Sequence, residues 1–538
     1  MLRRAFSRPL CLLMLVTGLF TFLIQSGELG TSDTTHRLQV THSLWTDVPQ
    51  VFADEYPDFG LYGRGGKLYA SYGIGQSLLM LPADLAGTAA SHLPLWRRYV
   101  TSETDPAIRS IVVSVSINIF VNLLTALASF RLLGLLGFSL RESVAGTLGL
   151  LCATTHLHYA QNMTENNYIF LLTITGFALQ YKWLTTGDRC SLVWGSAALG
   201  LNLLTRITTA LDIFGAGCFL LLASLFARYG SHPDTKPPTS AWRRSVHVYL
   251  QTALPIYAFF LLLDRAYQYI RFGSWTNTYV SILARQQRQR EPSLPINFPF
   301  DGHWFQGGLN SGVWGPLFAP DKSIFLFDPM FPLALLLTVL LWKQLEPRVR
   351  AFLGASVVLL ASYIAFYGRY GSWAGDFAWG DRYVSSAVEL TTLLALPLLL
   401  RYRRALGRPM WYLALLITAC SAAVQCASLA FWLPLEIYQM ETLGPHRWVV
   451  LLRFKNIAGY TLGRWDAWGL NTPAIYQDRW DAAHITTWNF LPSLLHHIGV
   501  APSWAVEVLR IVWLAMALAL AFASARLVQI LIRPTPNR

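Results

Sequence analysis

The chain has 538 residues, of which 54% are hydrophobic and only 13% are charged. A soluble domain carries roughly 25% charged residues, so this composition and a mean hydropathy of +0.38 exclude an ordinary soluble protein. The formal net charge of +13 is explained by basic cytoplasmic loops that face anionic lipid headgroups, and we expect no nucleic-acid partner. The sequence therefore predicts an all-α integral membrane protein with many spans.

About twelve stretches are apolar and long enough to cross a bilayer, which takes about 20 residues. They are 9–25, 110–130, 143–159, 166–183, 191–206, 210–227, 246–263, 325–342, 351–367, 384–400, 411–432 and 508–531. The region 191–227 could instead form one re-entrant element. The first stretch could be a cleaved signal peptide, although no small-residue cleavage site follows Leu23.

Lysine and arginine collect in alternate loops, and this pattern predicts which loops face the cytoplasm. With the N-terminus inside, every inner loop is basic, from Arg3, Arg4 and Arg8 at the start, through Arg401, Arg403, Arg404 and Arg408, to Arg533 and Arg538. We therefore expect a multi-pass cell (inner) membrane protein with both termini in the cytoplasm.

The expected outer loops are long and rich in Trp, Tyr, Gly, Pro and charge, so we look for function there. They are 26–109, 264–324, 368–383 and 433–507. This gives a transmembrane catalytic module over 1–432 with a first outer loop over 26–109, an outer subdomain over 433–507, and a final span and tail over 508–538. Within the first loop, Gly73 to Trp96 predicts helices on the membrane surface.

Acids and cations gather at the outer ends of the spans. A carboxylate close to a hydroxyl can act as a general base, and arginines can stabilise charge on a departing phosphate. Arg206 is flanked by apolar residues and needs a partner; a lipid phosphate fits, with snorkelling to headgroups as the alternative. The stretch "RQQRQRE", residues 285–291, predicts a solvated turn, with contact to an anionic acceptor as the alternative.

The order of one N-terminal span, an acid shortly after it, a long first outer loop and then many spans resembles the GT-C superfamily. These are polyprenyl-phosphate-sugar-dependent glycosyltransferases of protein O-mannosyltransferase and aminoarabinose-transferase type. The resemblance implies a GT-C-type bundle of about 12 transmembrane helices with extracytoplasmic loops. It covers most of residues 1–400.

Four local strings carry the resemblance. "SDTTHRLQVTHSLWTD" resembles the first-loop motif and implies that Asp33 is the general base. "ATTHLHYAQNMTENNYIFLLTITGFAL" implies a second acid at Glu165. "WGPLFAPDKSIFLFDP" and "GSWAGDFAWGDRYVSSAVEL" resemble later segments that, with Arg206, would bind the donor phosphate through Lys322, Arg382 and Tyr383.

The string "GRGGKLYASYGIGQSLLMLPADLAG" resembles a further first-loop segment. The expected acceptor and loop residues are His36, Arg37, Arg64, Lys67 and Tyr69. Thr34 stands where many members carry a second acid, which leaves open whether a divalent cation joins the site. Asp381 replaces the usual proline before Arg382.

The implied activity is transfer of a monosaccharide from a polyprenyl-phosphate donor to a hydroxyl on a glycan, lipid or protein acceptor, with inversion, on the extracytoplasmic side. A lipid-linked glycan transporter would use the same basic outer residues to bind a headgroup without chemistry. A non-catalytic partner protein would show a scattered set of outer charges with no shared cavity. We expect no metal site from the cysteines, which show no CxxC spacing, or from His36 and His42, which lack a third ligand. Asp33 could also simply cap a helix over Thr34–Leu44.

Overall fold

The structure is a computed structural model that describes residues 8–56, 58–96, 107–230, 239–306, 308–375, 378–432, 435–436, 439, 448–464, 487–498 and 501–532. The described part is predominantly helical, so the all-α fold class is confirmed. The helices of its first half are α1 (Arg8–Ile24), α2 (Ser32–His42), α3 (Gly75–Ser91), α4 (Ala107–Leu135), α5 (Leu140–Ala153), α6 (His156–Gln161), α7 (Glu165–Thr186), α8 (Arg189–Leu203), α9 (Ala210–Gly230) and α10 (Thr239–Phe272). Those of its second half are α11 (Tyr279–Arg290), α12 (Trp314–Phe318), α13 (Ile324–Phe327), α14 (Met330–Leu341), α15 (Pro347–Tyr367), α16 (Ser385–Thr392), α17 (Ala395–Arg401), α18 (Arg403–Ser428), α20 (Val449–Thr461), α23 (Leu491–Ile498) and α24 (Ser503–Ile532).

Six of the described helical segments are long and apolar enough to cross a membrane. They are Ile108–Leu135, Ile207–Arg228, Arg243–Phe272, Pro347–Tyr367, Arg403–Ser428 and Ser503–Ile532. Helices α1 and α14 are apolar but shorter. Three expected spans are interrupted, 143–159 by the end of α5, 325–342 by the end of α13 and 384–400 by the end of α16. The structure thus supports a helical membrane protein, and the count of twelve spans stays a prediction.

The region 191–227 forms two helices, and whether they cross the membrane twice or form one re-entrant element stays a prediction. Helix α8 ends at Leu203, and a short 3₁₀ turn (Ile207–Thr209) leads into α9. Before it, Gly187 ends α7 with a left-handed φ of 72°, and the Asp188 side chain caps α8 by accepting the Cys190 amide hydrogen bond. A left-handed glycine followed by a capping aspartate is a favourable way to join two antiparallel helices.

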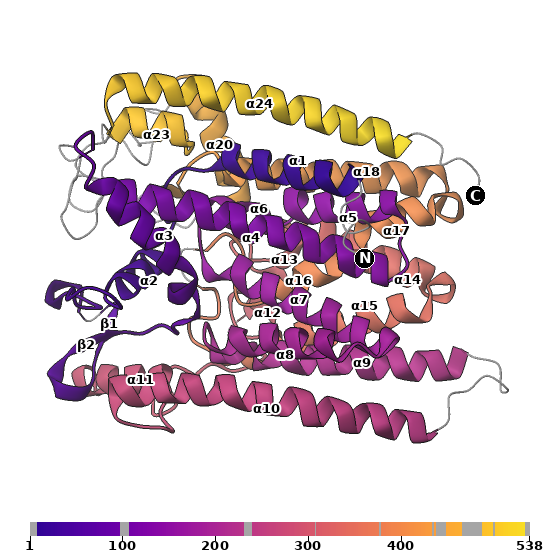
Figure 1. The fold of residues 1–538 in the computed structure, drawn as a ribbon, viewed down its shortest axis with the longest axis horizontal. Helices are drawn as coiled ribbons and strands as arrows, with labels where there is room; N and C mark the ends of the chain where they lie inside the picture. The colour runs from indigo at the N-terminus through magenta and orange to yellow at the C-terminus, as the bar shows by residue number, and fades with distance from the viewer. Residues whose placement is uncertain are drawn as a thin grey trace.

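The helices form a bundle whose two ends differ (Figure 1). Helix α1 packs against α24, and the start of α1 and the end of α24 lie at the same end of the bundle. Helices α2, α3 and α11 lie at the other end. The start of α1 and the end of α24 thus share one end of the bundle, and the side of the membrane that this end faces stays a prediction.

A small hairpin stands at the α2 end, which the sequence pattern did not predict. Strand β1 (Gly60–Tyr62) pairs antiparallel with β2 (Leu68–Ala70). Gly65 and Gly66 make the turn with φ of 67° and 70°, a region that glycine occupies without steric cost. Gln286 on α11 holds the hairpin by exchanging two hydrogen bonds with the Tyr62 backbone.

The outward faces of the long helices are apolar. Leu518 on α24 is 75% exposed and Leu262 on α10 is 61% exposed. Such surfaces are unfavourable in water and ordinary in lipid, so they favour a membrane environment. About half of the predicted outer subdomain over 433–507 lies outside the described residues, including five of its nine tryptophans and tyrosines.

Candidate active site

Asp33 lies in the first turn of α2, close to Arg382 from the loop before α16. The side-chain cap of α2 is Thr31, whose hydroxyl accepts the Thr34 amide at 3.3 Å, so the alternative that Asp33 caps the helix is wrong. The Asp33 carboxylate instead accepts hydrogen bonds from Arg382 Nη1 at 2.8 Å and from the Tyr72 hydroxyl at 2.8 Å. The fold therefore joins two residues that are 349 positions apart.

Glu165, the first residue of α7, is bound by two arginines. Arg37 Nη1 donates to one carboxylate oxygen at 2.6 Å, and Arg206 Nη2 donates to the other. The exposed fractions are 2% for Glu165, 4% for Arg37 and 8% for Arg206. Charge-assisted bonds to both oxygens fix the carboxylate, so Arg37 and Arg206 are held on either side of it.

Tyrosine rings connect these two groups of ion pairs. The guanidinium carbon of Arg206 lies 4.8 Å from the centroid of the Tyr383 ring, and that of Arg382 lies 5.3 Å from the same centroid. Arg37 lies 4.5 Å from the ring centroid of Tyr72. We call this set the Asp33 cluster: Asp33, Arg37, Tyr72, Glu165, Arg206, Arg382 and Tyr383. Its three arginines and two carboxylates give a net charge of 3 − 2 = +1 when both acids are ionised.

Both acids of the cluster have a lowered pKa. Burial alone would raise the pKa of Asp33, but the positive charges of Arg382 and Arg37 outweigh burial and lower it. Burial also opposes the ionisation of Glu165, and Arg37 and Arg206 nevertheless hold its pKa well below the usual value. Both carboxylates are therefore ionised at neutral pH. The cluster is preorganised to receive an additional negative charge, because one positive charge is in excess.

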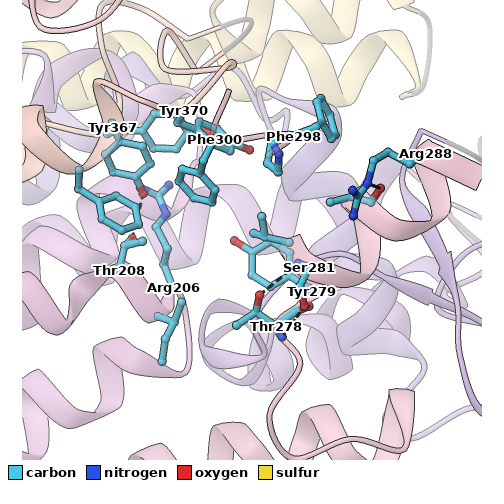
Figure 2. A pocket seen from close by; sticks show the side chains of 16 residues that line it. Arg206, Thr208, Thr278, Tyr279, Ser281, Arg288, Phe298, Phe300, Tyr367 and Tyr370 are labelled. Atoms are coloured by element: carbon cyan, nitrogen blue, oxygen red, sulfur yellow. Dashed lines mark hydrogen bonds between the residues drawn. The ribbon is translucent and has the colours of Figure 1, made fainter. Parts of the chain in front are cut away.

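A cavity of about 460 Å³ adjoins the cluster at Arg206 and Tyr383 (Figure 2). Arg206 and Thr208 lie on one side of it, and Tyr279 and Arg288 of α11 lie on another. Its aromatic lining consists of Tyr279, Phe298, Phe300, Phe366, Tyr367, Tyr370 and Tyr383. This size is typical of small-ligand sites, which span roughly 300–1,000 Å³, and the lining combines cations with flat apolar surfaces.

Lys322 and Asp381 belong to the surroundings of the cluster. Lys322 Nζ donates to the Ala378 carbonyl at 2.7 Å. Asp381 Oδ1 accepts the Tyr383 amide at 2.9 Å, and its Oδ2 has no hydrogen-bond partner within the described ranges. Burial raises the pKa of Asp381 to about 7, although the amide bond and the nearby lysine and arginines lower it.

Four expected acceptor residues take positions away from the cluster. They are His36, Arg64, Lys67 and Tyr69. His36 Nε2 lies 3.2 Å from Glu55 Oε1, and the other three lie in the β1–β2 hairpin, where Arg64 covers the Tyr269 ring of α10. Of the expected acceptor set, Arg37 has joined the cluster. The roles assigned from the sequence to all of these residues stay predictions.

Sequence reasoning missed Tyr72 and Arg288. Tyr72 follows the hairpin, and no pattern marks it as a partner of Asp33. Arg288 sits in a highly charged stretch that predicts a solvated turn, yet the stretch forms α11 and Arg288 lines the cavity. Phe298 and Phe300 follow Arg288 closely in the sequence and also line the cavity. Two aromatic residues so near a charged stretch were the signal that could have indicated a cavity wall there.

No group of three histidine, cysteine, aspartate or glutamate side chains that could hold a metal ion occurs among the residues that the structure describes. His42 lies 3.0 Å from the buried carboxylate of Asp84 through Nδ1. The question of a divalent cation therefore has no candidate site in this part of the chain.

Comparisons with known proteins leave the family of this chain unassigned. No protein-family model matches, and no curated protein matches in sequence. Among solved structures, the chain is similar to the Archaeoglobus fulgidus oligosaccharyltransferase in the apo form, with a TM-score of 0.43 and 12% sequence identity. The match covers 78% of this chain and 55% of that one, so the chain spans about half the length of that protein.

Proposed function

We propose that the protein is a membrane glycosyltransferase that moves a monosaccharide from a polyprenyl-phosphate donor to a hydroxyl acceptor, with inversion at the anomeric carbon. The observation that carries the proposal is the Asp33 cluster itself. Asp33 from the first loop pairs with Arg382 from a distant part of the chain. Beside them Glu165 pairs with Arg37 and Arg206, and the excess positive charge lies next to a cavity lined by aromatic rings.

In this reaction the acceptor oxygen attacks the anomeric carbon as the bond from that carbon to the phosphate oxygen breaks. The phosphate leaves with the bonding electron pair, and Asp33 takes the acceptor proton. Arg206 and Arg382 stabilise the charge that develops on the phosphate, an effect that is strong in a site sheltered from water. Arg288 extends the same positive lining along the cavity. Glu165 keeps Arg206 and Arg37 in position.

Arg382 cannot bind Asp33 and the donor phosphate fully at the same time. While it is bonded to Asp33, it lowers the pKa of that carboxyl and makes it a weak base. When a donor phosphate attracts Arg382, Asp33 loses its strongest positive partner and its basicity rises. Donor binding would thus activate the base, which limits proton uptake by Asp33 until the donor is in place.

The proposed orientation of the protein in the membrane follows from its basic loops. The inner loops carry the lysines and arginines, which supports cytoplasmic termini and an extracytoplasmic site in a cell membrane. The donor then reaches the cavity from the lipid, and the acceptor approaches from outside as a glycan, lipid or protein hydroxyl.

The test is transfer by purified Asp33→Asn protein offered labelled polyprenyl-phosphate sugars. We expect a loss of at least about a hundredfold in turnover, the lower range for removal of a general base, with donor binding retained. Asp47→Asn is the matched control, because Asp47 is an exposed acid of the same loop and its variant should keep full activity. Unchanged transfer by Asp33→Asn would exclude the proposed base. A lipid-linked glycan transporter would instead move the labelled lipid between leaflets without forming a product.

A further inference from the structure

A second group of arginines lies at the opposite end of the bundle from the Asp33 cluster, where α17 gives way to α18 (Figure 1). Here a hollow of about 390 Å³ is lined by Arg403, Arg404, Gly407, Arg408, Trp411 and Tyr412. We call this site the arginine hollow. All three arginines are exposed. The end on which they lie is the one that the basic loops predict to face the cytoplasm.

Local backbone geometry brings the three arginines around one space. Gly407 has φ 73° and ψ 170°, a conformation that is essentially restricted to glycine. This residue interrupts the regular helix between Arg404 and Arg408, so the side chains on either side of it line one hollow. The guanidinium carbon of Arg403 lies 4.5 Å from the Trp411 ring centroid, and this contact fixes one wall.

The charges of the hollow are not compensated by acids. Within the described ranges, Arg403, Arg404 and Arg408 form no ion pair with a carboxylate. Arg401, only two residues before Arg403, differs because it pairs with Glu142 at 2.8 Å and Glu346 at 3.2 Å. Glu142 and Glu346 are therefore paired with another arginine, and the hollow keeps three positive charges in one small volume.

The helix that continues from the hollow has an apolar, exposed face. Tyr412, directly in the hollow, is 66% exposed; Leu413, Leu415 and Leu416 in the next turn are 45%, 41% and 61% exposed. They belong to α18, a segment apolar and long enough to cross a membrane. A molecule with its anionic group among the arginines would thus have lipid-facing surface directly below it, where acyl chains can pack. Trp411 and Tyr412 lie at the boundary, where aromatic side chains are favoured.

We propose that the arginine hollow binds the phosphate headgroup of an anionic phospholipid of the surrounding leaflet. Guanidinium groups suit phosphate because they donate two parallel hydrogen bonds to its oxygens, and basic pockets at the cytoplasmic ends of spans bind such headgroups. The continuous apolar face of α18 favours a lipid over a free phosphate ion. This site is independent of the proposed glycosyl transfer.

The test measures lipid binding to the purified full-length protein by native mass spectrometry in detergent. Dioleoylphosphatidylglycerol is titrated against dioleoylphosphatidylcholine, and inorganic phosphate is added as a competitor. We expect the wild type to bind one phosphatidylglycerol more tightly than phosphatidylcholine. The combined variant Arg403→Gln, Arg404→Gln, Arg408→Gln should weaken that binding at least about tenfold.

Two controls separate binding from folding. Arg243→Gln with Arg244→Gln removes two exposed arginines of α10, and its binding should equal that of the wild type. The triple arginine-to-lysine variant keeps the charge but lacks the paired donors, so its binding should lie between those of the wild type and the triple glutamine variant. Equal affinity for the two lipids, or no loss in the triple glutamine variant while the protein stays folded, would overturn the proposal. Full displacement by millimolar inorganic phosphate would overturn the lipid as the ligand.

Discussion

The arginines at the two ends of this bundle differ in burial and in whether a carboxylate pairs with them. In the Asp33 cluster, Arg37 and Arg206 are buried and share one carboxylate. In the arginine hollow, the three arginines are exposed and no acid pairs with them in the described parts of the chain. A buried charge requires a partner, whereas an exposed one stays hydrated. The difference teaches that a buried carboxylate holds the first group in place before any ligand binds, whereas no acid of the described chain holds the second group.

The largest expected effect comes from removing the shared acid of the buried group. Glu165→Ala leaves Arg37 and Arg206 buried without their partner, and breaking a buried ion pair costs about 3–5 kcal/mol. We expect a protein that fails to fold or melts far below the wild type in a thermal denaturation assay. The triple glutamine variant of the arginine hollow should melt close to the wild type in neutral lipid. Equal stability of Glu165→Ala and wild type would contradict the comparison.

Arg288 is intermediate between the two groups of arginines, because it is partly buried but bonds to carbonyl oxygens and not to a carboxylate. It is half-buried, and its guanidinium donates to the carbonyls of Ile296 and Ala284 at 3.0 and 3.4 Å. Arg288→Gln should keep the fold but raise the KM for the donor about tenfold, the equivalent of one charge-assisted hydrogen bond. The variant Arg285→Gln, an exposed residue one turn earlier on α11, is the control. A raised KM in both variants would show that the cavity is not the donor site.

Much of the fold follows from hydropathy, because long apolar runs have few alternatives to helices in lipid. Each of the expected spans falls in helix, whole or interrupted. The interruptions were harder to foresee. The end of α16 near Leu393 has Glu389, Thr391 and Thr392 before it and an apolar run after it, but no glycine or proline stands at the break itself. The β1–β2 hairpin has only three residues in each strand, too few for an alternating pattern.

For the site, too, some features could be predicted from the sequence and others could not. Charge and position in the sequence, helped by a resemblance, singled out Asp33, Glu165, Arg206 and Arg382, and the fold brings them together. Which arginine pairs with which acid could not be predicted, because Arg37 and Glu165 are 128 positions apart and meet only in the folded chain. Arg288 was missed because charge on one helix says nothing about whether a loop will cover it.

The smallest expected effect concerns Asp381, a buried acid beside the cluster that has no counterpart in the arginine hollow. Its pKa is about 7 in the fold against an ordinary value of 3.8. Between those two pH values the folded protein holds a proton that the unfolded chain has released, so stability falls as pH rises from about 4 to 7 and is constant above that.

The variant Asp381→Asn removes this pH-dependent loss of stability and keeps the oxygen that accepts the Tyr383 amide. We expect the melting temperature of the wild type to fall a few degrees more than that of the variant between about pH 5 and pH 7.5. The triple glutamine variant should follow the wild type over this range, because arginine does not titrate there. Parallel curves for the wild type and Asp381→Asn would mean that the Asp381 carboxyl is already ionised in the fold below pH 7. Burial would then not change the protonation of this acid, and the contrast between the buried and the exposed end would not extend to it.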